Sequence, residues 1–331
     1  MAAVVGGLAF LISAACVPLL VRFAVGRQML DMPNLRSSHE VPTPRLGGIA
    51  IVCGAWAGPV VGGVLYGTQE PGGLWPILAA ATLVALVGLA DDLANVPLAV
   101  RAGAQALAAL ALLLLYPPPA FEALPGAAGI LLLAIGVFWV VALVNAFNFM
   151  DGIDGLVAGV ALVNLAFLAA IVGGYGVFAA LAGASAGFLL WNVNPASIFL
   201  GDVGSYFLGF TLAAGALYVS APGAGAGLPG LLACVLVFTP FLIDTSYTLL
   251  SRWRAGKDIF SAHREHVYQR ITPTGAMHRR TSVLYYGASV AAGFAALMVY
   301  GGGGAALLGV LAALLLCAGV LALPKVFGEA E

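Results

Sequence analysis

The chain alternates long stretches without a charged side chain and short polar segments that hold most of its ionisable residues. The uncharged stretches are residues 1–21, 46–69, 71–90, 102–121, 123–150, 155–201, 203–243 and 281–324. About 20 apolar residues cross a bilayer as an α-helix. Each of the last three stretches is long enough for two crossings and is interrupted by glycine or proline near 173–176, 221–223 and 301–304. The pattern predicts an all-α, polytopic membrane bundle of eleven transmembrane helices, or ten if one short segment is re-entrant.

The basic residues predict the orientation of these helices, because Lys and Arg are retained on the cytoplasmic side of a membrane. In an eleven-helix arrangement, all 13 Lys and Arg residues fall on one face of the bundle. The connections on the opposite face contain Glu70 and Glu122 and no cation. We therefore expect one transmembrane domain over residues 1–331, with the N-terminus outside and the C-terminus in the cytoplasm. Its cytoplasmic loops are 22–45, 91–101, 145–155, 193–205 and 251–280.

Composition narrows the class of protein further. Only 8% of the residues are charged and 62% are hydrophobic, whereas a soluble domain carries about a quarter charged residues. A soluble enzyme with one buried core is therefore excluded. The net charge of -1 gives no basic surface for nucleic acid. The four cysteines stand far apart in apolar stretches, which favours inert buried thiols over disulfides or a thiolate metal site.

The acidic residues gather on the same face as the basic ones. Ionisable groups at the ends of membrane helices are costly and are usually functional. One or two acidic loops would be ordinary solvated turns, but acids in five separate connections favour a single polar site where the loops converge. These acids are Asp31, Asp91, Asp92, Asp151, Asp154, Asp202, Asp244, Asp258 and Glu265.

The densest polar group lies in residues 145–155. Asn145, Asn148, Asp151 and Asp154 recur at every third position, which on a continuous helix places them in one stripe. Glycines beside the two aspartates permit a close approach of a ligand. A helix cap would need only one Asp, so the four residues together predict a binding site.

Two further acidic motifs indicate a divalent cation. The carboxylates of Asp91 and Asp92, at the end of the third predicted span, repel each other unless a cation neutralises them; the alternative is a capped helix terminus. Asp202 stands between glycines at the start of the eighth span, where helix N–H groups favour anionic ligands. Oxygen ligands suit Mg²⁺, or Mn²⁺ in its place, and such metals bridge carboxylates to phosphates.

The last cytoplasmic loop carries His263 and His266 on one face of a helical turn, together with Arg264 and Arg270. A zinc site is the weaker interpretation, because no third nitrogen or sulfur ligand is near in sequence. A basic loop on anionic lipid would explain the arginines but not the histidine spacing. Beside a metal and carboxylate centre, these side chains suit a pyrophosphate clamp.

In this order, the motifs resemble those of the polyprenyl-phosphate N-acetylhexosamine-1-phosphate transferases, the superfamily of the peptidoglycan translocase and of enzymes that initiate O-antigen and teichoic acid synthesis. The resemblance covers nearly the whole chain: Asp31 to Asn34 with Pro44 to Gly48, Asp91-Asp92, Asn145 to Leu156, Gly201 to Ser205, and His263 to Arg270. It implies transfer of a sugar-1-phosphate from a UDP-N-acetylhexosamine to undecaprenyl phosphate, releasing UMP at the cytoplasmic face of the bacterial inner membrane. A homodimer is one assembly that the resemblance allows.

The resemblance also implies roles for individual residues. Asp202 and Asn148 would hold Mg²⁺ on the donor pyrophosphate, and Asp91, supported by Asp92, would deprotonate or orient the lipid phosphate. The substrate-binding residues would be Asn145, Asp151 and Asp154 toward the uridine, His263, Arg264 and His266 on the donor phosphates and sugar, and Arg36, His39 and Arg45 as candidates for the lipid phosphate.

Two departures argue against the peptidoglycan branch and its muramoyl-pentapeptide substrate. Leu93-Ala94-Asn95 follows the paired aspartates where that branch has a lysine, and His263-Arg264-Glu265-His266 replaces a run of three histidines. The first loop, 36–45, looks most like the branch that initiates O-antigen or similar surface polysaccharides. The alternative class is a lipid or anion transporter or flippase, which typically has mid-bilayer charges and two related halves; neither is evident in this sequence.

Overall fold

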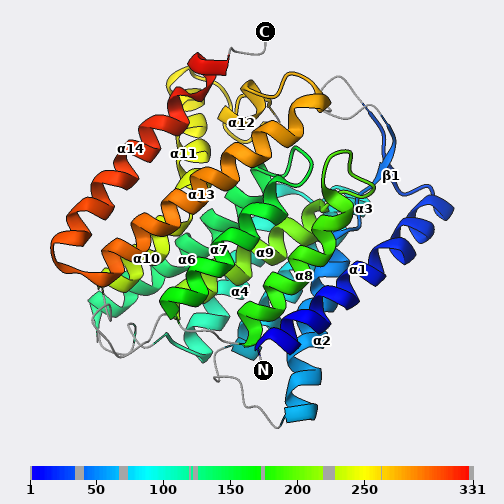
Figure 1. The fold of residues 1–331 in the computed structure, drawn as a ribbon, viewed down its shortest axis with the longest axis horizontal. Coiled ribbons are helices and arrows are strands. Elements are labelled where there is room, and N and C mark those ends of the chain that lie inside the picture. Colours follow the sequence, from blue (N-terminus) through cyan, green and yellow to red (C-terminus); the bar gives the residue numbers. More distant parts are fainter. Residues whose placement is uncertain are drawn as a thin grey trace.

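Figure 1 shows the computed structural model, a bundle of long helices that run between two ends of the molecule. It describes residues 2–33, 41–66, 74–118, 121, 126–172, 176–218, 228–261 and 263–327. The helices are α1 (Ala2–Gly26), α2 (Gly48–Tyr66), α3 (Leu74–Ala94), α4 (Leu98–Leu115), α6 (Ala127–Phe149), α7 (Leu156–Val172), α8 (Gly176–Asn192), α9 (Gly201–Leu217), α10 (Leu228–Val237), α11 (Thr239–Arg254), α12 (Val267–Arg270), α13 (His278–Gly301) and α14 (Gly303–Phe327). The all-α prediction is confirmed, with one addition: β1 (Leu30–Asp31) pairs antiparallel with β2 (Thr43–Pro44).

Many of these helices have the length and composition of membrane spans. Within the described residues, six helices pass as spans by themselves: α1, α3, α4, α6, α13 and α14. A seventh results if α10 and α11, which are bent by 72° at their junction, form one broken span. α2, α7 and α8 are shorter apolar helices. The polytopic membrane bundle is confirmed, whereas the count of eleven and the orientation of the termini stay predictions.

Of the three helix breaks expected from glycine and proline, the structure describes one fully and one in part. The break near 301–304 separates α13 from α14 at Gly302, whose φ of 72° lies in the left-handed region that favours glycine. The break near 173–176 comes just before α8, and residues 173–175 and 221–223 lie outside the described residues.

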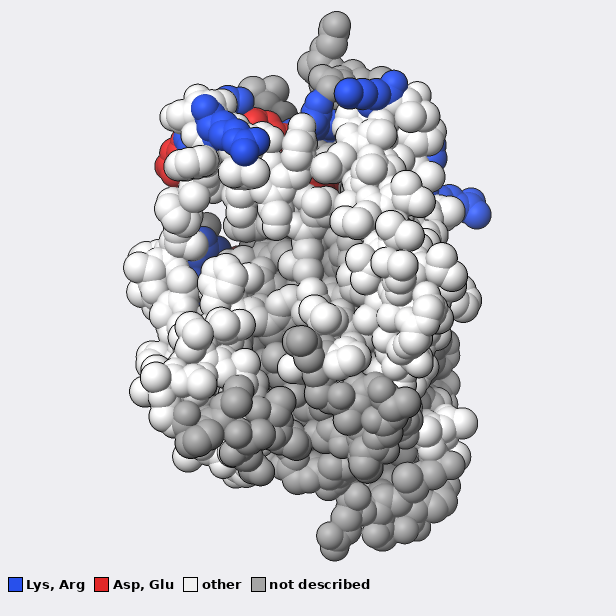
Figure 2. Space-filling model, turned by 90° about the vertical axis from the view of Figure 1, so that its left-hand side faces the viewer, with Lys and Arg blue, Asp and Glu red and all other residues white. Residues whose placement is uncertain are grey.

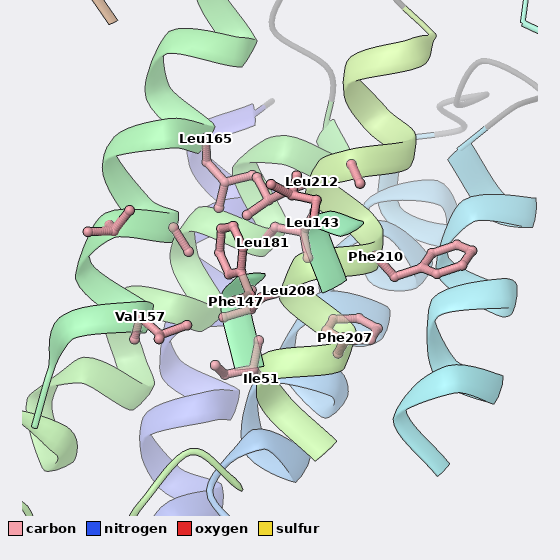
Figure 3. Close-up of a cluster of buried hydrophobic side chains, with 14 of the residues drawn as sticks. Ile51, Leu143, Phe147, Val157, Leu165, Leu181, Phe207, Leu208, Phe210 and Leu212 are labelled. Carbon is pink, nitrogen blue, oxygen red and sulfur yellow. The ribbon is translucent and has the colours of Figure 1, made fainter. Parts of the chain in front are cut away.

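Helix α9 lies at the centre of the bundle. All of its residues from Val203 to Ala216 are buried, as expected for a helix that is apolar all round. Figure 3 shows Phe207, Leu208 and Leu212 of α9 among side chains from the surrounding helices, including Leu143 and Phe147 of α6. Because Asp202 lies in the first turn of α9, the packed core fixes the position of that carboxylate.

The segment after β2 is tied to the start of α9 by backbone contacts. Phe199 donates its N–H to Pro44 (2.7 Å), and Gly48 donates to Leu200 (2.8 Å). At Gly48, an added Cβ would lie only 2.2 Å from the Gly204 nitrogen and 2.3 Å from its Cα. The glycine motifs of the first loop and of α9 are therefore two halves of one close contact.

This contact predicts that Gly48→Ala destabilises the protein by about 1–3 kcal/mol, the usual cost of overpacking a well-packed core. The methyl group would meet the backbone of Gly204, which has no side chain that can move away. A lower thermal unfolding midpoint in detergent is the expected observation. Gly7→Ala in α1 is the matched control, because nothing lies within 4 Å of an added Cβ there; equal midpoints for the two variants would contradict the contact.

The charged side chains gather at one end of the bundle. Figure 2 shows Lys and Arg together with Asp and Glu at the upper end, above a wide surface of uncharged residues. In Figure 1 this is the end that carries α12 and β1. The described loops that hold the predicted site therefore share one end of the molecule.

Candidate active site

Helices α3 and α9 bring together three of the predicted carboxylates, Asp91, Asp92 and Asp202, which form an acidic group. Asp92, near the end of α3, accepts hydrogen bonds from the backbone N–H groups of Asp202 (3.1 Å) and Val203 (3.2 Å). At Gly88, one turn earlier, an added Cβ would lie 2.5 Å from the Asp202 carbonyl oxygen. The first N–H groups of α9, expected to face an anionic ligand, are thus capped by a protein carboxylate. Asp92 fixes where Asp202 lies.

Arg101 of α4 is the cationic partner of this acidic group. Its Nη1 atom donates to Asp91 Oδ2, lies 3.6 Å from Asp202 Oδ2 and donates to the Tyr206 hydroxyl at 3.3 Å. The other Asp91 oxygen accepts the Val96 N–H at 2.7 Å. In the sequence, Arg101 indicates only the orientation of the bundle. A signal was available, since Arg101 stands in the first turns of the helix that follows Asp91 after a short connection.

Asn148 of α6 holds the Asp202 side chain from the opposite side. Its Nδ2 atom donates to Asp202 Oδ1 at 2.8 Å and to Ser205 Oγ at 3.2 Å. Asn145, one turn earlier, instead donates to Gln105 Oε1 on α4 at 2.7 Å. The two asparagines therefore serve different contacts: one faces the acidic group and the other joins α6 to α4.

The predicted helical stripe of Asn145, Asn148, Asp151 and Asp154 is wrong. Helix α6 ends at Phe149, and the two aspartates lie in the connection to α7. Gly155, whose φ of 75° lies in the left-handed region that favours glycine, directly precedes α7 and belongs to this connection.

Asp151 belongs to the acidic group despite this correction. Burial, with the negative charge of Asp92 adding to it, raises the pKa of its carboxyl to about 8 against the opposing effects of Arg45 and the Gly201 N–H. These influences place Asp151 beside Asp92 and the start of α9. A cationic or metal-bound ligand would restore the ionised form of this carboxyl.

The Asp154 carboxylate is bound by other residues of the protein. Its Oδ2 atom accepts from Asn194 Nδ2 (2.8 Å) and the Ala196 N–H (3.2 Å), and it lies 3.3 Å from His278 Nδ1. Burial alone would raise the pKa of Asp154, but the hydrogen bonds from His278 and Asn194 hold it below its ordinary value. The Asp154 carbonyl also accepts from Ser282. Asp154 thus ties the start of α7 to residues 194–196 and α13, and its contact with uridine stays a prediction.

The last loop is folded around the buried Arg252. Its guanidinium donates to Glu265 Oε1, to the Asp258 carbonyl oxygen (2.6 Å) and to Ser261 Oγ (2.9 Å). The loop leaves His263 and Arg264 partly exposed. Burial, with the charges of His266 and Arg252 adding to it, lowers the pKa of His263 to about 4, so this imidazole is neutral at neutral pH.

Of the three residues predicted to contact the lipid phosphate, Arg45 lies within the described residues. Arg45 forms an ion pair with Asp31 (2.6 Å), and its carbonyl oxygen would lie 2.2 Å from a Cβ added at Gly201. Arg36 and His39 lie outside the described residues. Arg45 therefore pairs with Asp31 of the first loop through its side chain and packs against the start of α9 through its backbone.

The acidic group fits a Mg²⁺ ion that is shared with a substrate. Asp91 and Asp202 lie next to each other, both within reach of Arg101 Nη1, and two adjacent carboxylates favour a cation between them. Across the described residues, no group of three or more His, Cys, Asp or Glu could hold a metal by itself. Mg²⁺ is commonly bound by one or two carboxylates, with substrate phosphates and water supplying the other ligands.

The chain is similar to known proteins. Residues 74–220 match the family model described as glycosyl transferase family 4. Over 77% of its length, the chain is 30% identical to the decaprenyl-phosphate N-acetylglucosaminephosphotransferase of Mycobacterium tuberculosis (strain ATCC 25618 / H37Rv), of which it covers 71%. The chain belongs to the polyprenyl-phosphate N-acetylhexosamine-1-phosphate transferase superfamily.

Two further members of the superfamily match over most of their length. The chain is 28% identical to the "Probable undecaprenyl-phosphate N-acetylglucosaminyl 1-phosphate transferase" of Bacillus subtilis (strain 168), over 84% of this chain and 80% of that protein. It is also 28% identical to the undecaprenyl-phosphate alpha-N-acetylglucosaminyl 1-phosphate transferase of Yersinia pestis, over 83% and 78%. The chain is thus a multi-pass bacterial membrane enzyme that transfers a phospho-sugar.

The region that matches the superfamily model contains the acidic group but not all of the predicted site. Asp91, Asp92, Arg101, Asn148 and Asp202 lie within it. Arg45 and the loop with His263, Arg264 and His266 lie outside it. In this transferase, the structure brings the two parts together at one end of the bundle (Figure 1).

Proposed function

We propose that this transferase moves HexNAc-1-phosphate from a UDP-N-acetylhexosamine to undecaprenyl phosphate, giving undecaprenyl-pyrophosphoryl-HexNAc and UMP. The observation that carries the proposal is the pair of carboxylates, Asp91 and Asp202, joined by Arg101 at the charged end of a membrane bundle. The names of the relatives, which are polyprenyl-phosphate N-acetylglucosamine-1-phosphate transferases, support it. The product would begin O-antigen or another cell-envelope polysaccharide.

The reaction is a phosphoryl transfer, which depends chiefly on positioning and charge neutralisation. An oxygen of the lipid phosphate attacks the phosphorus attached to the sugar, and the bond from that phosphorus to the UMP oxygen breaks. Asp91 orients the lipid phosphate and accepts its proton where one is present, while Arg101 neutralises the charge that collects beside it. Asp202 and Asn148 are the residues that would hold Mg²⁺, which when bound neutralises the donor pyrophosphate.

The remaining residues are proposed to bind the donor. His263, Arg264 and His266 meet the phosphates and sugar, since a neutral imidazole can donate a hydrogen bond and a guanidinium pairs with phosphate oxygens. Asp151 is proposed for the uridine side. We place the site at the cytoplasmic face of the inner membrane because the cations gather at the same end as the acidic group.

The test is release of UMP by the purified full-length protein in detergent. We expect turnover when undecaprenyl phosphate is supplied with one member of a panel of UDP-HexNAc donors, including the GlcNAc, FucNAc and QuiNAc forms. Chelation of divalent metal should abolish turnover, and added Mg²⁺ should restore it. Failure with every donor, together with substrate uptake into vesicles, would instead favour the transporter class.

A further inference from the structure

The carboxylate of Asp244 on α11 is fully buried, with 0% of the residue exposed. It accepts the N–H of Val267 (2.8 Å), the N–H of Tyr268 (3.0 Å) and the Tyr285 hydroxyl, and its Oδ1 lies 3.1 Å from His266 Nδ1. A buried carboxylate is tolerated only when donors satisfy its oxygens. Three of these donors belong to consecutive residues of the last loop, so one buried acid holds the loop in place.

The loop held by Asp244 lies against the end of α6. The His266 ring stacks on Phe149, with centroids 5.8 Å apart, and on His263, at 5.0 Å. The Tyr268 hydroxyl donates to the Phe149 carbonyl oxygen at 3.0 Å. A Cβ added at Gly152 would lie 2.2 Å from the same hydroxyl. The loop therefore docks on the turn that carries Asp151.

Asp244 also sets the orientation of the His266 ring. Both of its oxygens accept hydrogen bonds from other groups, and Oδ1 also faces the His266 Nδ1 atom at 3.1 Å. The Gln269 N–H approaches the His266 side chain as well, at the start of α12. Together, the contacts with Asp244 and with Gln269 hold the His266 ring in its orientation.

We infer that Asp244 is a positioning residue for donor binding. It does not touch the substrate; it fixes the place and orientation of His266, and with it His263, beside the acidic group. The inference rests on the proposed function, in which these histidines bind the donor phosphates and sugar. The sequence places Asp244 among the acids at span ends and indicates no role for it, because its partners in the last loop and in α13 lie 22 to 41 residues away.

The first test needs no turnover. In Asp244→Asn, an amide group replaces one oxygen, so at least one loop N–H loses its acceptor. We expect hydrogen exchange in peptides covering Val267 and Tyr268 of the full-length protein to become at least about tenfold faster, the effect of losing one hydrogen bond to a charged group. Thr245→Val is the matched control: its neighbouring, buried hydroxyl has no hydrogen-bond partner among the described residues. Unchanged exchange in Asp244→Asn would overturn the inference.

The second test separates positioning from general stability. Asp244→Asn should raise the KM for the donor about tenfold and leave the KM for undecaprenyl phosphate unchanged. Added to His266→Ala, it should cause little further loss, because residues that act through one contact are not additive. Equal effects on both substrates, or full additivity with His266→Ala, would reject the role.

A second variant covers the case in which Asp244→Asn does not fold. Tyr285→Phe removes one donor to Asp244 and keeps the carboxylate, so both exchange and the donor KM should rise by about threefold; unchanged values would count against the inference. An inactive wild-type protein with the expected exchange pattern would reject the proposed function and leave the structural role of Asp244 intact.

Discussion

Replacing Asp202 with Asn lowers kcat for sugar-phosphate transfer at least about a hundredfold, the usual cost of removing a preorganised charge from a transition state. Asp202 Oδ1 is already held by Asn148, and Oδ2 faces Arg101. The oxygen that faces Arg101 is therefore the part of the carboxylate next to Asp91, where the proposed reaction needs a negative ligand for the cation on the transferred phosphate. An uncharged amide cannot supply that ligand.

The matched control for this variant is Thr211→Val on the same helix. Thr211 is buried, and its hydroxyl donates to the Phe207 and Leu208 carbonyl oxygens of α9. We expect its UMP release to stay near that of the wild type. Rates for Asp202→Asn within a few-fold of the wild type, measured at saturating donor and acceptor, would remove Asp202 from the mechanism.

Asp91→Asn is the second substitution with a large expected effect, again at least about a hundredfold on kcat. The Asp91 carboxylate pairs with Arg101 and accepts the Val96 N–H, so it is a fixed negative group beside the proposed phosphate position. An amide there cannot accept a proton from the lipid phosphate. Single-turnover measurement of UMP formation tests this, because it reports the chemical step without product release.

Asp92→Asn provides the contrast for Asp91→Asn. Asp92 acts as the cap of α9, and an Asn side chain can still accept one of its two N–H groups. We expect a loss of stability of about 1 kcal/mol, as for other helix caps, and a smaller loss of rate than in Asp91→Asn. A larger loss of single-turnover rate in Asp92→Asn than in Asp91→Asn would reverse the two roles.

The sequence predicted which residues gather at one end of the molecule, because uncharged stretches and glycine breaks are local features. It did not predict which of them face one another. Arg101 was visible only as a cation, although its guanidinium joins Asp91 and Asp202. The partner of Asp154, His278, is 124 residues away. Contacts between residues so far apart in the sequence depend on how the helices pack. The spacing of residues along the chain does not contain that information.

The error over residues 145–154 has a different cause. Three-residue spacing places side chains in a stripe only while the helix continues, and α6 stops at Phe149. The glycines of this segment are compatible with a ligand contact and with a turn between helices. In the structure, the segment forms a turn. Asn148 and Asp151 nevertheless both reach the acidic group, one from the helix and the other from the turn, and their functional roles stay predictions.

The contact between α3 and α9 has a mechanical consequence. Membrane helices adapt to bilayer thickness by tilting. Asp92 holds the first N–H groups of α9, and at Gly88 the two backbones touch, so a tilt of α3 carries the start of α9 with it. We therefore expect Asp91 and Asp202 to move together, with a separation that changes little with lipid composition. Such changes would act instead on the position of the last loop, where the donor is proposed to bind.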